Sequence, residues 1–402
     1  MELLSVAKLA LYGIFLNYYC YHIFTGSLLP YGTALFFCVA LGCVGLSILR
    51  DRKVRVGYEV KCWLAYIALS LLTMVFALDM GEAFDSIIKY VQRLIIIILI
   101  VYICEKENSI QFPLRLLAVN AVACAIAVLF TIDDIQLKLD ISTGAAVSQN
   151  DVGALMAFGC FAVLFAFGKR NSTSFLTTAF KFASVIAMVT VIFLAGSRKS
   201  IIAVGITLVL LLLLNGKEYL KNSSAKKALI ITVLGVAAFI FISKYLAPYA
   251  EETSLYTRTF GRGVERTASS DDVRIELYIQ AFREFMRHPL VGLGFNNYVV
   301  EYGTYTHSTY AEPLACSGVI GLLYLAPYVR ILKKQIRLVR LTREDRMENK
   351  KQKELFAFYI AFLFIGIGIP FIYKDDPCII LAMFIASQHI TCQRLGGRNE
   401  NA

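Results

Sequence analysis

Charged residues, histidine and tryptophan are all scarce in this chain of 402 residues. Only 17% of the residues are charged, and the chain has four histidines and one tryptophan. A typical soluble domain has about 25% charged residues, so the composition argues against one. The ten cysteines include no CxxC pair, and we expect neither a disulfide framework nor a cysteine metal site.

Apolar sequence takes the place of charge. Hydrophobic residues make up 58% of the chain, and uncharged apolar runs occupy 184–196 and 201–214. About 20 apolar residues are enough for a helix to span a bilayer. We therefore predict an all-α polytopic membrane protein with about twelve transmembrane helices. The expected spans are 3–23, 28–49, 59–78, 86–104, 112–131, 151–168, 175–195, 199–215, 227–246, 309–329, 355–373 and 375–392.

Lysine and arginine are concentrated in alternate loops, chiefly 50–61, 216–227 and 330–353. Such loops lie in the cytoplasm, so both termini are expected there. The same pattern accounts for the net charge of +11 without a nucleic-acid partner. The predicted organisation is transmembrane helices 1–9 over 1–246, an extracytoplasmic catalytic loop over 247–308, transmembrane helices 10–12 over 309–392 with a cytoplasmic loop at 330–354, and a cytoplasmic tail over 393–402.

The long outer loop contains no lysine between residues 247 and 306. It has six arginines, namely Arg258, Arg262, Arg266, Arg274, Arg283 and Arg287. Arginine is preferred where a planar group must bind phosphate through two hydrogen bonds. Eight acidic residues in the same loop allow surface ion pairs instead, so composition leaves both interpretations open.

Within this loop, Ser269–Pro289 is expected to form an amphipathic helix that lies on the membrane surface over a cavity. One apolar face recurs every three or four residues and consists of Ile275, Ile279, Phe282 and Met286. Ser270 or Asp271 would cap the helix, and Pro289 would end it. Arg274 would then lie in the first turn, where the helix dipole favours an anion.

Arg198 and Lys199 begin a predicted span on its outer side, where the positive-inside rule does not expect them. Their side chains could reach the lipid headgroups. Alternatively, they could form an anion site with the free N–H groups of the helix start.

His307 lies just before the apolar run of the tenth predicted span, five residues ahead of Glu312. A histidine with a pKa near 6.5 can accept a proton at neutral pH, and a carboxylate can orient its ring. A lone histidine at the end of a helix can also be purely structural, so spacing leaves its role open.

Four segments carry a resemblance to a known family. They are SQNDVGALMAFG (148–159), AGSRKSIIAVGITLVLLLL (195–213), DVRIELYIQAFREFMRHPLVGLGFNNY (272–298) and THSTYAEPLACSGVIGLLYL (306–325). In this order they resemble the O-antigen polymerase and ligase superfamily. Its members commonly have Asn-x-x-Gly and Ser-Arg at span starts, a helix ending in Pro-x-x-Gly-x-Gly, and His-Asn or His-Ser before a glycine-rich helix.

The resemblance implies a glycosyltransferase of the GT-C type on the outer face of the bacterial cytoplasmic membrane. Its donor would be a glycan on undecaprenyl pyrophosphate, and it would use neither a metal nor another cofactor. The family's catalytic histidine corresponds to His307, and its pyrophosphate-binding arginines correspond to Arg198 and Arg274. The remaining expected substrate-binding residues are Lys199, Arg258, Arg262, Glu312 and Asn150.

The resulting hypothesis is a polysaccharide polymerase for O-antigen, capsule or exopolysaccharide. The bilayer would be one partner, and a chain-length regulator protein is a further candidate. One alternative is a ligase that moves the finished glycan to another acceptor. A second is a polysaccharide transporter or flippase, which would be expected to show repeated halves and interrupted helices; neither is seen in the sequence.

Overall fold

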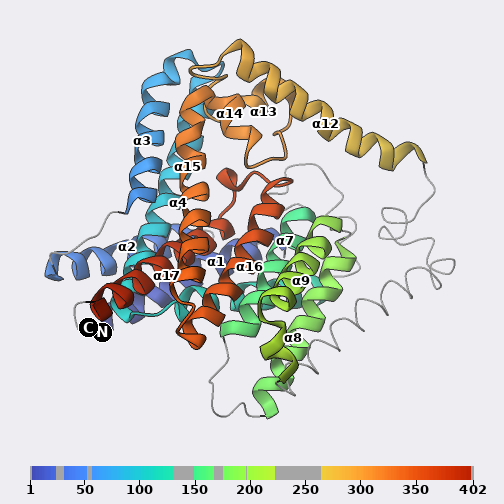
Figure 1. Cartoon of the computed structure of the whole chain (residues 1–402). Coiled ribbons are helices and arrows are strands. Elements are labelled where there is room, and N and C mark those ends of the chain that lie inside the picture. The colour runs from blue at the N-terminus through green and yellow to red at the C-terminus, as the bar shows by residue number, and fades with distance from the viewer. Residues whose placement is uncertain are drawn as a thin grey trace.

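The computed structural model describes residues 2–23, 31–51, 57–130, 149–166, 175–195, 197–221 and 264–399. This part of the chain is helical and contains no β-strand (Figure 1). Its α-helices are α1 (Glu2–Ile23), α2 (Gly32–Asp51), α3 (Tyr58–Thr73), α4 (Met80–Glu107), α5 (Gln111–Phe130), α7 (Gln149–Ala166), α8 (Phe175–Leu194), α9 (Arg198–Lys221), α12 (Val264–Arg287), α13 (Asn297–Tyr302), α14 (Ala311–Ser317), α15 (Gly321–Leu341), α16 (Arg346–Gly366) and α17 (Asp376–Asn399). The 3-10 helices are η1 (Met74–Phe76), η3 (Gly318–Ile320) and η4 (Phe371–Tyr373).

The all-α polytopic membrane fold is confirmed. Among the described residues, eight helical segments are long and apolar enough to cross a membrane. They are α2, α3 with η1, α4, α5, α8, α9 as far as Asn215, α14 with α15, and α17 as far as Gly396. Eleven of the twelve expected spans coincide with helices, and the expected span 227–246 lies outside the described residues.

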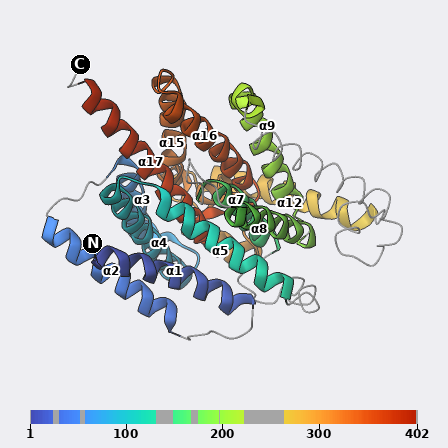
Figure 2. The ribbon, with the colours of Figure 1, turned by 90° about the horizontal axis from the view of Figure 1, so that it is seen from below.

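The helices form a bundle with α12, α13 and α14 gathered at one end (Figure 1). The start of α1 and the end of α17 both lie away from α12 (Figures 1 and 2). Viewed from below, α7 lies among α5, α8 and α9 (Figure 2). The start of α7, the start of α9 and the loop before α14 therefore bring residues distant in sequence to one region.

The tenth expected span, 309–329, is interrupted. Helix α14 ends at Ser317, and Gly318 has a φ of 57°, in the left-handed region that favours glycine. A Cβ atom at Gly318 would collide with the carbonyl oxygen of Pro289. The break therefore exists where the chain leaving α12 approaches the span.

The Pro-x-x-Gly-x-Gly turn after α12 is hydrogen-bonded to this break. The Val319 N–H donates to the Pro289 carbonyl at 2.8 Å. In return, Leu293 donates to Ala315 at 3.1 Å, and Gly294 donates to the Cys316 carbonyl at 2.9 Å. An unsatisfied backbone group is costly in a membrane, so the turn and the break stabilise each other.

One expected helix boundary was wrong. Helix α12 begins at Val264, so Ser270 and Asp271 lie inside it, and Arg274 is about three turns from its start. The dipole argument for Arg274 therefore does not hold. Helix α16 begins at Arg346, ahead of the expected span 355–373, and the Asp345 side chain caps it by accepting hydrogen bonds at 3.1 Å from two N–H groups of its first turn.

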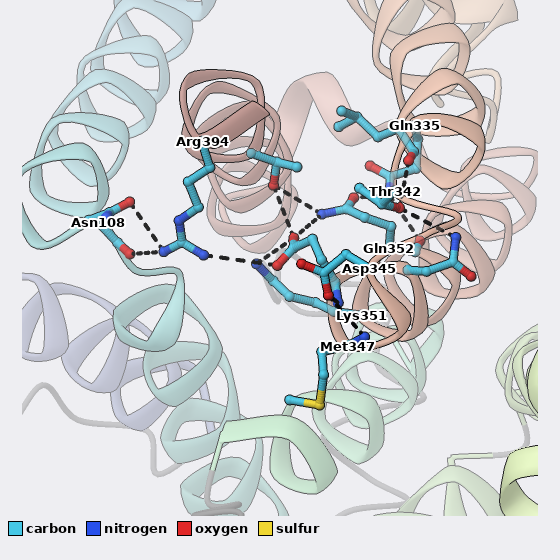
Figure 3. Close-up of polar contacts among 12 residues, drawn as sticks. Asn108, Gln335, Thr342, Asp345, Met347, Lys351, Gln352 and Arg394 are labelled. Atoms are coloured by element: carbon cyan, nitrogen blue, oxygen red, sulfur yellow. Dashed lines mark hydrogen bonds and ion pairs between the residues drawn. The ribbon is translucent and has the colours of Figure 1, made fainter. Parts of the chain in front are cut away.

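Helices α15 and α16 form a hairpin whose contacts include buried polar side chains (Figure 3). Gln335 donates to the side-chain oxygen of Gln352 at 2.7 Å, and Gln352 donates to Thr391 of α17 at 3.1 Å. Asn349 donates to the Val339 carbonyl at 2.7 Å. These bonds tie three helices together at the end of the bundle away from α12.

Replacing Gly318 with alanine is expected to lower the thermal unfolding temperature, measured by circular dichroism on purified protein. The left-handed backbone costs a residue with a Cβ roughly 1–2 kcal/mol, and the collision with Pro289 adds to this. Gly303→Ala is the matched control, since Gly303 has a φ of 69° but a Cβ atom added there would meet no atom within 4 Å. Equal shifts in the two variants would contradict the proposed role of the close approach.

Candidate functional site

His307 lies in the loop between α13 and α14. Its backbone has a φ of 56°, which is uncommon for a residue other than glycine. Its side chain is half-buried, while its neighbours Thr306 and Ser308 are buried. The ring packs on Tyr305, with 4.4 Å between the ring centroids. The loop thus holds the imidazole in one defined place.

The shape of this loop depends on Glu312, which is fully buried. One carboxylate oxygen accepts a hydrogen bond from the Thr306 N–H at 2.7 Å. The other accepts one from the Tyr373 hydroxyl at 2.8 Å, and the Glu312 N–H donates to the Ser308 carbonyl at 3.1 Å. Glu312 is therefore hydrogen-bonded to the residues on both sides of His307, and it links this loop to η4.

Three cations and one acid surround His307. Burial, together with the positive charges of Arg274 and Lys199, lowers the pKa of His307 to about 4. The nearby Asp151 raises this pKa, and Lys374 lowers it further. The imidazole is therefore neutral at pH 7, in a region where positive charge is in excess.

Asp151 of α7 and Lys374, two residues before α17, form an ion pair at 2.6 Å although they are far apart in sequence. The Lys374 ammonium also lies 5.9 Å from the centre of the Tyr305 ring. Burial disfavours the charge on Lys374, but Asp151 and Tyr305 outweigh it and raise the Lys374 pKa. Lys374 is thus a charged member of the site.

The segment that carries Lys374 is held by Arg93 of α4. The Arg93 guanidinium donates to Asp375 at 2.7 Å and to the carbonyls of Ile372 and Tyr373 at 3.2 and 2.9 Å. Sequence reasoning missed Arg93, Asp151 and Lys374. Arg93 could have been found, because a charge inside an expected span is a functional candidate by default.

The other expected site residues differ in how far they are exposed. Lys199 is half-buried and passes over Gly368, where any side chain would collide with its ammonium. Arg198 is the first residue of α9 and is exposed. Asn150 is half-buried beside Asp151. Arg258 and Arg262 lie outside the described residues.

The starts of α7 and α9 are packed closely together, which sets the positions of Asp151 and Lys199. The Ser197 and Ser200 hydroxyls are 2.7 Å apart. A Cβ at Gly153 would collide with the Ser197 side chain, so glycine in the Asn-x-x-Gly motif permits this contact. Within the described residues, no group of three or more His, Cys, Asp or Glu side chains is placed to hold a metal ion.

Helix α12 delivers Arg274 to the site. The Tyr278 hydroxyl, one turn from Arg274, donates to the Ile367 carbonyl beyond the end of α16 at 2.7 Å. The arrangement as a whole can bind a strongly negative group and place a neutral imidazole beside it.

His307 is expected to remain neutral down to about pH 4 in the substrate-free protein. Because the unfolded chain binds this proton near pH 6.5, the residue lowers stability progressively as pH falls from 6.5 towards 4. The test is a titration of ¹³C-labelled histidine by NMR, with the signal assigned through His307→Gln. Adding inorganic pyrophosphate should raise the pKa, and a titration near 6.5 without it would contradict the geometry.

Comparison with known proteins finds one matching family model. No curated protein matches the chain. Residues 183–326 match the family model described as O-Antigen ligase, and this segment contains Arg198, Lys199, Arg274 and His307. The match supports polymerase- or ligase-type activity on glycans in general. The match over residues 183–326 is consistent with the resemblance to the O-antigen polymerase and ligase superfamily.

Proposed function

We propose that this protein is a polysaccharide polymerase that transfers a growing glycan from undecaprenyl pyrophosphate to the end sugar of another lipid-linked repeat unit. The observation that carries the proposal is the positive charge of Lys199, Arg274 and Lys374 acting on His307, with Lys374 5.9 Å from the Tyr305 ring that packs on the His307 ring. Displacing a lipid pyrophosphate from a sugar carbon requires positive charge where the leaving group becomes more negative. Lysine and arginine can supply it, so the proposed reaction uses no metal.

In the proposed step, the acceptor hydroxyl oxygen forms a bond to the anomeric carbon of the donor sugar. The bond from that carbon to the pyrophosphate oxygen breaks, and undecaprenyl pyrophosphate leaves with the electron pair. His307 takes the hydroxyl proton. Arg274 and Lys199 hold the pyrophosphate, and Arg198 approaches it from the exposed start of α9.

The low pKa of His307 fits this step once the donor is considered. In the empty site, burial and the surrounding cations make the ring a weak proton acceptor. A bound pyrophosphate would offset the positive charge and raise the His307 pKa. The base would therefore be strengthened by the substrate whose reaction it serves.

The remaining candidates have supporting roles in this proposal. Glu312 positions His307 through Thr306, and Asn150 lies at the edge of the site beside Asp151. In this proposal Arg258 and Arg262 also bind the pyrophosphate of the donor. We place the reaction on the extracytoplasmic face of the bacterial cytoplasmic membrane, with a chain-length regulator as a candidate partner.

A ligase is the second candidate, because the matching family model is described as O-Antigen ligase. The donor and the cationic cluster would be the same. The difference would be the acceptor, which would be another lipid or a protein rather than a lipid-linked repeat unit.

The deciding experiment is polymerisation in proteoliposomes with a defined lipid-linked repeat unit, followed by gel analysis. The unmodified protein should give a ladder of products. We expect His307→Ala, and the double variant Arg198→Ala with Arg274→Ala, to lose about 100-fold or more in rate. Arg283→Ala is the control, since Arg283 is an exposed arginine of the same helix.

Each alternative outcome has a meaning. A full ladder from the double arginine variant would refute the proposed pyrophosphate site. If His307→Ala still gives a full ladder, His307 does not take part in the reaction. No ladder from the unmodified protein, together with transfer of the glycan to a different acceptor, would establish the ligase instead.

Lys374 is expected to bind the donor rather than only to pair with Asp151. Lys374→Gln should lower kcat/KM for the lipid-linked donor by about tenfold or more. The double variant with Asp151→Asn separates the two roles. If pairing is the only role, removing both charges restores activity, whereas a donor ligand stays lost.

A further inference from the structure

Helix α12 packs on the protein through one narrow face. Leu277, Ala281 and Glu284 are 6%, 2% and 3% exposed, and they recur at spacings of four and three residues, as one helix face does. Tyr298 donates from its hydroxyl to the Leu277 carbonyl at 2.9 Å, and Tyr302 donates to the Glu284 carboxylate at 2.8 Å. This face fixes α12 to α13 and α14.

The opposite face of the same helix is apolar and exposed. It consists of Ile275, Ile279, Phe282 and Met286, which are 56%, 46%, 63% and 62% exposed. Each lies two residues from a member of the buried face, and two residues correspond to about 200° of rotation. We call these four residues the outer stripe. They are the apolar face expected from the sequence, but they do not pack closely on the part of the chain that the structure describes.

A third face of α12 is polar. Glu276, Arg283 and Arg287 are exposed on it. It lies roughly opposite the side of Tyr278, whose hydroxyl bonds to the chain beyond α16. The outer stripe therefore lies between a face turned to the ends of the membrane helices and a face turned away from them.

The surroundings of α12 indicate what meets the outer stripe. Figure 1 shows α12 crossing the end of the bundle rather than running along it. The turn after α12 exposes Leu290, at 69%. This turn packs on the segment after α3, since the Leu78 N–H donates to the Leu293 carbonyl at 3.2 Å.

The segment after α3 is itself apolar and exposed. Val75, Phe76 and Leu78 are 66%, 69% and 55% exposed, and α3 with η1 is long and apolar enough to cross a membrane. Exposed apolar side chains therefore continue from α12 to the end of a membrane span. Surfaces of this kind are rarely left in water.

We infer that α12 is an interfacial helix whose outer stripe inserts among the lipid acyl chains of the leaflet on its side of the membrane. An amphipathic helix in this position buries its apolar face at the boundary of headgroups and acyl chains. Arg274 would then be held at the depth of lipid phosphates, a consequence that rests on the proposed function. The membrane contact itself does not.

The test uses tryptophan fluorescence, because the chain has a single tryptophan, Trp63. In a Trp63→Phe background, Phe282→Trp reports on the outer stripe and Arg283→Trp on the polar face. Both proteins are placed in vesicles of phosphatidylcholine with or without brominated acyl chains. We expect brominated lipid to quench most of the Phe282→Trp emission and little of the Arg283→Trp emission.

Trp63 is buried and donates to the Tyr324 carbonyl at 3.2 Å, so its replacement can impair folding. In that case Phe282→Trp and Arg283→Trp are each made in the protein that retains Trp63, and the quenching of the parent protein is subtracted from theirs. Equal quenching of the two reporters, or none at position 282, would overturn the inference. The latter result would show that lipid does not cover the outer stripe. Since no activity is measured, failure here is distinct from failure of the proposed reaction.

Discussion

The hydrogen bonds between the broken span at Gly318 and the turn at 289–294 are the constraint on which the site depends. A span that stops at Ser317 leaves carbonyl groups without helical partners, and lipid offers none. The turn supplies N–H groups to Ala315 and Cys316. In doing so it fixes the direction in which α12 leaves the bundle, and hence the position of Arg274. The same break sets the length of α14, whose first turn carries Glu312.

Around this junction the site is built before any substrate arrives. The buried Glu312 imposes the left-handed backbone of His307 by bonding to Thr306 and by donating to Ser308. Arg93 fixes the segment that carries Lys374. Positive side chains are thus held near one another against their mutual repulsion. Electrostatic preorganisation of this kind favours whichever state of the substrate carries the most negative charge.

Much of this arrangement could be predicted from the sequence. Long apolar runs gave the helices, and the periodicity of Ile275 to Met286 gave an amphipathic helix, because both signals are local. Three features were not predictable: the break at Gly318, the pairing of Asp151 with Lys374, and the hydrogen bonds of Glu312 to the residues beside His307. Each depends on a contact between distant segments that leaves only a weak local trace. The start of α12 was misplaced because a residue that caps a helix well can also lie inside one.

The ion pair between Asp151 and Lys374 has a consequence for modularity. The matching domain spans residues 183–326, so neither partner lies inside it, and neither does Arg93. The domain carries His307, Lys199 and Arg274, but the flanking helices carry the charges that tune them. A chimera that exchanged only the matched segment between relatives would inherit the proposed donor-binding residues but not the flanking charges that act on them. Transferring the activity intact would require α4, α7 and the start of α17 to travel with it.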